Sequence, residues 1–166
     1  MNEIITRTLE YFNKAGIVIS ESEKSSLEIA DFGLGDLENT GLQILTYVNT
    51  ERCCAKELVL FPHQTCPEHR HPPVGGREGK EETFRCRYGR VFLYVEGEPT
   101  QDMQTQPPEG KYSVFHEIIL NPGEQYTLAP NIKHWFKADA GGAVISEFST
   151  KSVDEADIFT DERIIR

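Results

Sequence analysis

From residue 41 onward, the sequence consists of short segments rich in β-branched and aromatic residues, separated by turn residues. These segments recur at intervals of roughly 8–12 residues, a spacing typical of antiparallel sandwiches and barrels. Gly89-Arg90 should form a tight turn between two of them. The pattern therefore predicts a mainly β fold. We expect strands at 42–48, 56–61, 83–88, 91–95, 113–120, 125–128, 133–138 and 143–148.

The first 36 residues differ from this pattern and predict a helical extension. Apolar residues recur at helical spacing over 3–13. Ser20, followed three residues later by Glu23, fits a capping box, and apolar positions at 27–30 continue a second helix. A chain of 166 residues is long enough for one hydrophobic core. We expect a single domain with a helical extension at 1–36, a β-barrel at 41–150 and a charged surface tail at 151–166.

The charge balance limits the partners that we expect. The chain carries 17 basic and 27 acidic residues, a net charge of −10. Nucleic acids and anionic membranes require clustered positive charge, so we expect neither as a partner. The longest apolar runs are too short to span a bilayer, and the N-terminus lacks a secretory pattern, so we expect a cytoplasmic protein. Four cysteines without a CxxC pair predict reduced thiols rather than a thiolate zinc site.

Two histidines separated by one residue, His69 and His71, are followed by a carboxylate, Glu82. If the backbone is extended here, both imidazoles leave it on the same face, since side-chain direction alternates with period two. Glu82 shares its parity with Phe84 and Cys86 and should therefore point to the interior, where a carboxylate needs a partner such as a metal ion. We take these three residues and His134 as ligands of a divalent metal ion.

A faint internal repeat supports the choice of His134. Residues 60–69 and 120–134 each contain a strand, a turn with proline, a short strand, a second proline and then a histidine. The repeat places His69 and His134 at comparable points in two halves of a barrel.

These residues resemble the two motifs of the cupin superfamily. The first motif is matched by His69-Arg70-His71, Glu82 and Gly89, and the second by Gly123, Pro130 and His134. Three features depart from the usual pattern. No glycine lies five residues before His69, ten residues separate His71 from Glu82, and no asparagine follows His134.

Within that superfamily, the departures are themselves typical of one group, and nearly the whole chain resembles the small bacterial D-lyxose isomerases. This resemblance implies a cupin-type double-stranded β-helix, a homodimer and interconversion of an aldose with its ketose. It also implies Mn²⁺ held by His69, His71, Glu82 and His134, with Fe²⁺, Co²⁺ and Zn²⁺ as alternatives. The matching runs are 56–62, 66–73, 79–89, 94–98, 130–136 and 157–161.

Isomerisation through a cis-enediol requires a base that moves a proton between C2 and C1. Glu147 is our candidate, because a charged residue within an apolar strand needs a reason, and a position near the ion would supply one. With the outward parity it would instead be a solvated strand residue. Lys80 is the candidate acid, and Lys56 is a weaker one. The lyxose/xylulose and mannose/fructose pairs share the C2 configuration that matters, so both are candidate substrates.

Three other functions remain open at this point. A phosphosugar isomerase would need a cationic pocket, for which Arg70, Arg85, Arg87 and Lys80 are available. An Fe²⁺-dependent cupin oxygenase would also need open positions on the metal ion. A non-catalytic sugar-binding cupin would bind metal and sugar without forming a product. The loop at 97–112 is interpreted as a lid or a subunit contact.

Overall fold

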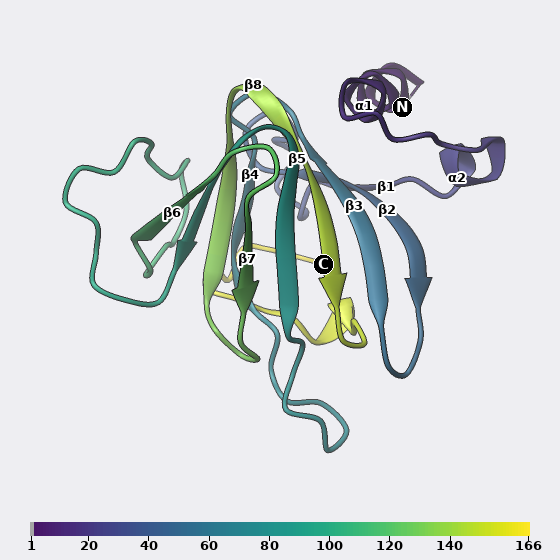
Figure 1. The fold of residues 1–166 in the computed structure, drawn as a ribbon. Coiled ribbons are helices and arrows are strands. Elements are labelled where there is room, and N and C mark those ends of the chain that lie inside the picture. Colours follow the sequence, from purple (N-terminus) through teal and green to yellow (C-terminus); the bar gives the residue numbers. More distant parts are fainter. Residues whose placement is uncertain (1) are drawn as a thin grey trace.

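A curled antiparallel sheet dominates the computed structural model, which describes residues 2–166 (Figure 1). Two helices precede it, α1 (Asn2–Lys14) and α2 (Glu21–Ser25), and a 3-10 helix, η1 (Asp154–Ala156), lies near its end. The sheet confirms the mainly β prediction. Its nine strands are β1 (Glu28–Ala30), β2 (Leu42–Asn49), β3 (Cys54–Leu60), β4 (Thr65–Arg70), β5 (Glu82–Val95), β6 (His116–Leu120), β7 (Gln125–Leu128), β8 (His134–Ser149) and β9 (Ile158–Phe159).

The two longest strands, β5 and β8, hold the curled sheet together. One path of neighbours runs β1-β2-β3-β8-β4-β9, and β5 pairs with β6, β7 and β8. Strand β8 pairs with β3 and β4, and with β5 along both of its halves. Strand β8 therefore connects β3 and β4 with β5 and the strands that pair with β5.

The predicted tight turn at Gly89-Arg90 was wrong, because the chain continues there as one bent strand. The register between β5 and β8 shifts on either side of Gly89, as it does at β-bulges, which bend long strands. Gly89 has φ 73°, and a Cβ at this position would lie 1.9 Å from the carbonyl oxygen of Gly142. The segments 133–138 and 143–148 likewise form the two halves of β8.

The helical extension is shorter than predicted. Ser20 caps α2 with both bonds of the capping box, as expected, but the helix ends at Ser25. Residues 28–30, which we placed in the helix, instead form β1 and pair with Leu42 and its neighbours in β2. The edge of β2 offers unpaired backbone groups, and satisfying them outweighs the helical spacing of a few apolar residues.

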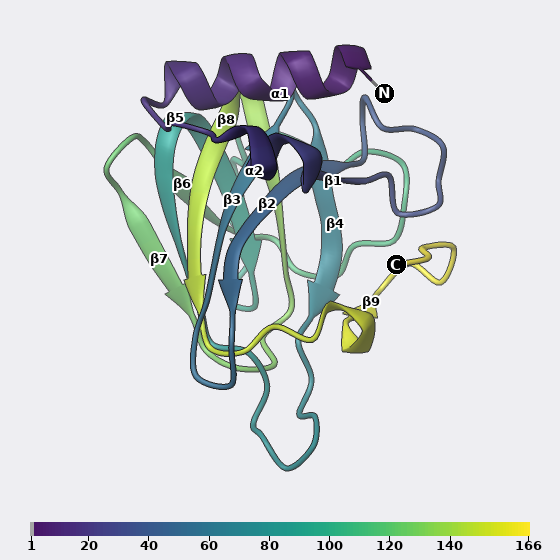
Figure 2. The same cartoon turned by 90° about the vertical axis from the view of Figure 1, so that its right-hand side faces the viewer.

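Alternate residues of the central strands build two apolar cores on opposite faces of the sheet. Ile44, Leu58 and Ile145 belong to the core enclosed by the curled sheet. Their sequence neighbours Leu45, Val59 and Val144 belong to a second core, together with Phe12 of α1. The helix and the segment that follows it thus cover one end of the outer face, and the other end of that face is bare (Figure 2). This arrangement follows from the period-two direction of side chains in a strand.

The prediction of a surface tail at 151–166 was wrong for part of this segment. Ser152 and Asp161 are buried, β9 pairs with β4, and the Phe159 ring lies 5.4 Å from the His69 ring. The tail is held because it supplies the outermost strand beside β4. The histidine motif therefore contacts the C-terminal segment directly.

The 97–112 loop lies beside β6, on the opposite side of the curled sheet from α1 and α2 (Figure 1). The core next to it contains Val114 and a stacked pair, Tyr94 and Trp135, and Trp135 Nε1 donates to the Val114 carbonyl at 2.8 Å. Among residues 2–166, no helix is both long and apolar enough to cross a membrane. All four cysteines are free, and only Cys53 is exposed.

Candidate metal centre

Three histidine side chains meet inside the curled sheet. His69 and His134 are directly paired residues of β4 and β8, and His71 follows one residue after the end of β4. One ring nitrogen from each lies within 4.8 Å of the others, and all three side chains are buried. The predicted shared face and the predicted correspondence of His69 with His134 thus hold. This buried group can bind a metal ion.

Each of the three rings is anchored through Nδ1. The Nδ1 of His69 lies 2.8 Å from the Pro67 carbonyl oxygen, and that of His134 lies 3.0 Å from the Ile132 carbonyl oxygen. His71 Nδ1 lies 2.5 Å from Oδ1 of Asp157, 86 residues away along the chain. A carbonyl oxygen can only accept, so the Nδ1 atoms of His69 and His134 donate and leave Nε2 as the atom available to a ligand. Metal-binding histidines are usually oriented by this type of bond.

Glu82 is the fourth group of the cluster. Its Oε1 lies 3.1 Å from His71 Nε2 and 3.0 Å from His134 Nε2, and the side chain is 1% exposed. His134 Nε2, although buried, makes no hydrogen bond with acceptable geometry within residues 2–166. Three imidazole nitrogens and a carboxylate are a suitable donor set for a divalent transition metal. The unsatisfied His134 nitrogen fits a cation at this point.

The electrostatics of the cluster keep His69 and Glu82 in their unprotonated forms. Burial, together with His134 and His71, holds the pKa of His69 well below its usual value. Burial disfavours ionised Glu82, but Lys80 and the two histidines beside it hold its pKa well below the usual range. Burial also opposes a charge on His71, but Glu82 and the bond to Asp157 raise its pKa to about 9.

Lys80 links the predicted ligand Glu82 to the predicted base Glu147. Its Nζ lies 2.7 Å from Glu82 Oε2 and 2.9 Å from Glu147 Oε1. Glu147 is 4% exposed and thus has the inward orientation. Burial lowers the pKa of Lys80, but Glu147 and Glu82 outweigh this effect and raise it above its usual value, so this side chain is an ammonium. Lys56, the weaker candidate, instead donates to Asp154 and Ser152.

Two adjoining cavities give access to these groups. The inner cavity, of about 40 Å³, is lined by His69, Glu82 and Glu147 together with apolar side chains. The outer cavity, of about 360 Å³, shares His71, Lys80 and Asp157 with the inner one. Its volume lies within the usual range for small-molecule pockets. A ligand in the outer cavity can therefore reach the cluster.

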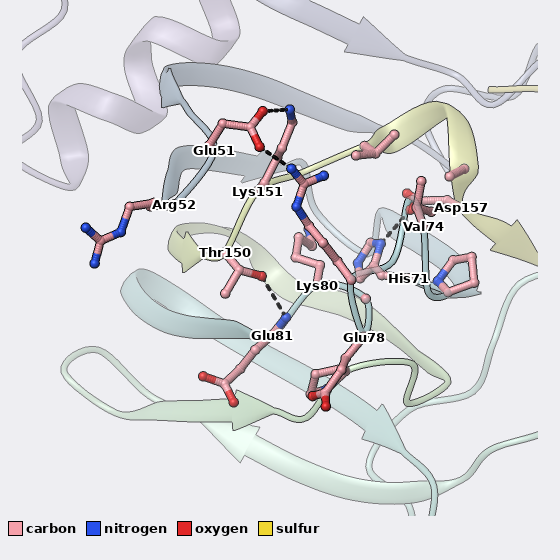
Figure 3. Close-up of a pocket in the computed structure, with 16 residues that line it drawn as sticks. Glu51, Arg52, His71, Val74, Glu78, Lys80, Glu81, Thr150, Lys151 and Asp157 are labelled. Carbon is pink, nitrogen blue, oxygen red and sulfur yellow. Dashed lines mark hydrogen bonds and ion pairs between the residues drawn. The ribbon is translucent and has the colours of Figure 1, made fainter.

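Three segments form the rim of the outer cavity: the turn after β2, the 72–81 loop and the start of the tail (Figure 3). Glu51 makes ion pairs with Arg77 and with Lys151 across this rim. The backbone N–H of Glu81 donates to Thr150 Oγ1 at 3.1 Å. The long insertion between His71 and Glu82 thus shapes the entrance.

The other predicted sites are not brought together. Arg85 donates to Gln125 and Arg87 to Ser146, and of the four residues considered for a phosphate pocket only Lys80 lines either cavity. No residue of 97–112 lines the cavities, so the rim is built by the 72–81 loop instead. Sequence reasoning missed Asp157, for which the only signal was the resemblance over 157–161.

Comparisons with known proteins identify the family. No protein-family model matches the chain. The D-lyxose/D-mannose isomerase of Thermosediminibacter oceani is 64% identical over 169 residues, which cover all of this chain and 93% of that protein. The D-lyxose ketol-isomerase of Cohnella laeviribosi is 61% identical and is matched over 96% of this chain and 90% of its own length. The chain belongs to the D-lyxose isomerase family. It is therefore an enzyme that interconverts an aldose and a ketose.

Solved structures support the fold. The L-ribose isomerase of Cellulomonas parahominis superposes with a TM-score of 0.75 at 16% identity, covering 98% of this chain and 91% of that one. The L-ribose isomerase of Acinetobacter sp. DL28 gives a TM-score of 0.71 at 15% identity, over 93% and 81% of the two chains. At this identity the likeness concerns the fold alone, and it confirms the cupin-type barrel.

Proposed function

We propose that this enzyme interconverts D-lyxose with D-xylulose and D-mannose with D-fructose, through a cis-enediol and with the help of a divalent metal ion. The observation that carries the proposal is the cluster of His69, His71, His134 and Glu82, with the unsatisfied His134 Nε2, beside the Lys80–Glu147 pair. The Thermosediminibacter relative is named for both D-lyxose and D-mannose, which favours both substrate pairs.

The four cluster residues are the proposed metal ligands, and Mn²⁺ is the proposed ion, with Fe²⁺, Co²⁺ and Zn²⁺ as alternatives. Three imidazoles and one carboxylate leave two positions of an octahedral ion for substrate oxygens. When bound, such an ion stabilises negative charge that develops on those oxygens. Metal analysis of the purified protein, and activity after reloading with each ion, will test the choice.

Glu147 is the proposed base that removes the proton from C2 and returns it at C1. The Lys80 ammonium lies 2.9 Å from Oε1 of Glu147 and holds this side chain in its inward position. Lys80 is also the proposed donor to a substrate oxygen, because an ammonium has three hydrogens and can serve Glu147, Glu82 and a ligand. Apolar side chains of the inner cavity, Phe84 and Phe136 among them, exclude water from the exchanging proton.

The decisive experiment is an assay of metal-loaded protein with a panel of free aldoses and their phosphates. We expect ketose from D-lyxose and D-mannose, without consumption of O₂. In D₂O, the product should carry deuterium at the exchanging carbon. Turnover only with phosphorylated sugars would favour the phosphosugar isomerase, and O₂ uptake the oxygenase. Binding without product would favour a sugar-binding protein, and an absence of deuterium would indicate a hydride shift.

The homodimer and the cytoplasmic location remain predictions. The bare outer face carries exposed apolar side chains, Tyr47 and Val48 of β2 and Phe148 of β8. Arg85 and Arg87 lie on the same sheet and make no ion pair within the described residues. We infer that a second copy covers this face. Light scattering should show that the unaltered protein is a dimer and that Phe148→Glu dissociates it. The control is Ile165→Glu, a change at another exposed apolar residue, which should leave the dimer intact.

A further inference from the structure

Glu68, which lies between Pro67 and His69 in the histidine motif, has no role in the proposed chemistry. It is nevertheless fully buried, with 0% exposure. Its Oε1 accepts hydrogen bonds from the hydroxyls of Ser113 (2.6 Å) and Thr160 (2.5 Å). Its Oε2 accepts from the backbone N–H groups of Ser113 (2.6 Å) and Val114 (3.0 Å). Within residues 2–166, it forms no ion pair.

A buried carboxylate that is held only by neutral donors requires all of them. Removing such a group from water is unfavourable unless hydrogen bonds replace the lost hydration. Hydrogen bonds to a charged group are also stronger than those between neutral groups. Glu68 therefore fixes the segments that supply its donors: the 113–114 backbone on one side and the C-terminal tail on the other.

The tail is attached at several points, among them Glu68 and the Lys56–Asp154 ion pair. Its strand β9 pairs with β4 at only two positions, His69↔Phe159 and Arg70↔Ile158. Glu68 adds two bonds to Thr160, through the hydroxyl and through the Glu68 carbonyl oxygen, which accepts from the Thr160 N–H at 3.1 Å. Two residues before Phe159, the same segment carries Asp157, which anchors His71 Nδ1. The ring of His71 is thus oriented by a tail that Glu68 holds in place.

We propose that Glu68 is a positioning residue of the metal centre: it clamps the C-terminal tail so that Asp157 holds the His71 imidazole toward the ion. This inference rests on the proposed metal centre. It assigns a function to the residue directly before His69, whose position in the strand has the opposite parity to His69 and His71.

The structure offers a matched pair of variants for the test. Thr160 and Ser113 donate to the same oxygen of Glu68, one from the tail and the other from the loop. Thr160→Val keeps the shape and the backbone bond but loses the tail's hydroxyl, whereas Ser113→Ala loses the loop's hydroxyl. We expect Thr160→Val to weaken Mn²⁺ binding by about tenfold, the usual effect of losing a group that orients a metal ligand. Thr160→Ser keeps the hydroxyl and should therefore keep the affinity of the unaltered protein. Ser113→Ala should change the affinity by less than about twofold, since its loop carries no ligand anchor.

Equilibrium dialysis gives the affinities, and thermal unfolding of the metal-free variants reports on the fold. Asp157→Asn should weaken binding by about 10–100-fold, and adding Thr160→Val to it should cause little further loss, because both act through the same anchor. Equal effects of Thr160→Val and Ser113→Ala, or additive effects of Thr160→Val and Asp157→Asn, would overturn the inference. If the unaltered protein binds no divalent ion, the proposed metal centre fails instead. If Thr160→Val does not fold, Glu68→Gln against Ser113→Ala supplies the same comparison.

Discussion

The buried centre and the exposed rim of the site use the same kinds of ion pair in opposite environments. At the centre, Lys80 pairs with Glu82 and Glu147, and all three side chains are at most 5% exposed. At the rim, Glu51 pairs with Arg77 and Lys151, and its side chain is 65% exposed. The charges are similar, but water reaches only the second group.

This difference decides what each region can do. Breaking a buried ion pair leaves a charge without a partner in a medium of low dielectric constant, and the loss is large. Exposed pairs contribute little, because water replaces the lost partner and salt screens the attraction. The loss of an ion pair at the centre should therefore cost far more than the loss of one at the rim. Four changes test this contrast, from the largest expected effect to the smallest.

His71→Ala should abolish stable binding of the metal ion. It removes one of three imidazoles whose ligand atoms lie within 4.8 Å of one another. Elemental analysis of the purified protein measures the loss. The exposed His63 provides the control, and His63→Ala should keep the metal. Full metal retention by His71→Ala would contradict the ligand assignment.

Glu147→Gln should keep the metal but lose turnover. The amide preserves the shape and a hydrogen-bond acceptor beside Lys80, but it cannot accept the C2 proton. We expect kcat to fall by about 10²–10⁴-fold, the usual contribution of a general base. Steady-state kinetics with D-lyxose, alongside metal analysis, measures both properties. Activity close to that of the unaltered enzyme would remove Glu147 as the base.

Lys56→Met should lower the free energy of unfolding and should weaken the dependence of that free energy on pH. Burial opposes ionisation of Asp154, but Lys56 and the Ser152 hydroxyl hold its pKa well below the usual range. Because the folded pKa is lowered, the pair stabilises the protein fully above about pH 4 and less as the pH falls. We expect the variant to lose about 1–3 kcal/mol of unfolding free energy at neutral pH and less in acid. Urea unfolding between pH 3 and pH 7 measures this. Identical pH profiles for both proteins would contradict the assignment.

Glu51→Gln should have the smallest effect. It removes both ion pairs of the rim, yet exposed pairs contribute little, so kcat/KM should change by less than about fivefold. The effect should also shrink at high ionic strength, since salt already weakens these pairs in the unaltered enzyme. Kinetics at low and high salt measures it. A loss as large as that of Glu147→Gln would contradict the small contribution expected of the exposed rim pairs.

Several features of the centre were predictable because they depend on local backbone geometry. The common direction of His69 and His71, and the inward direction of Glu82 with Phe84 and Cys86, follow from the alternation of side chains along a strand. The bends at Gly89 and Gly142 were not predictable in this way. A glycine in a strand-like segment is compatible with a turn or with a bend, and only the close approach of β5 to β8 decides between them.

The sequence by itself determined the mainly β class, the residues able to bind a metal ion and the family. These properties depend on residue types and on periods of two, which any extended segment obeys. Only the tertiary structure decided that Glu147 faces Lys80, that Asp157 anchors His71 and that Glu68 holds the tail. Each of these contacts joins residues more than 60 positions apart, and such contacts leave no local pattern, since the packing of the whole sheet selects them.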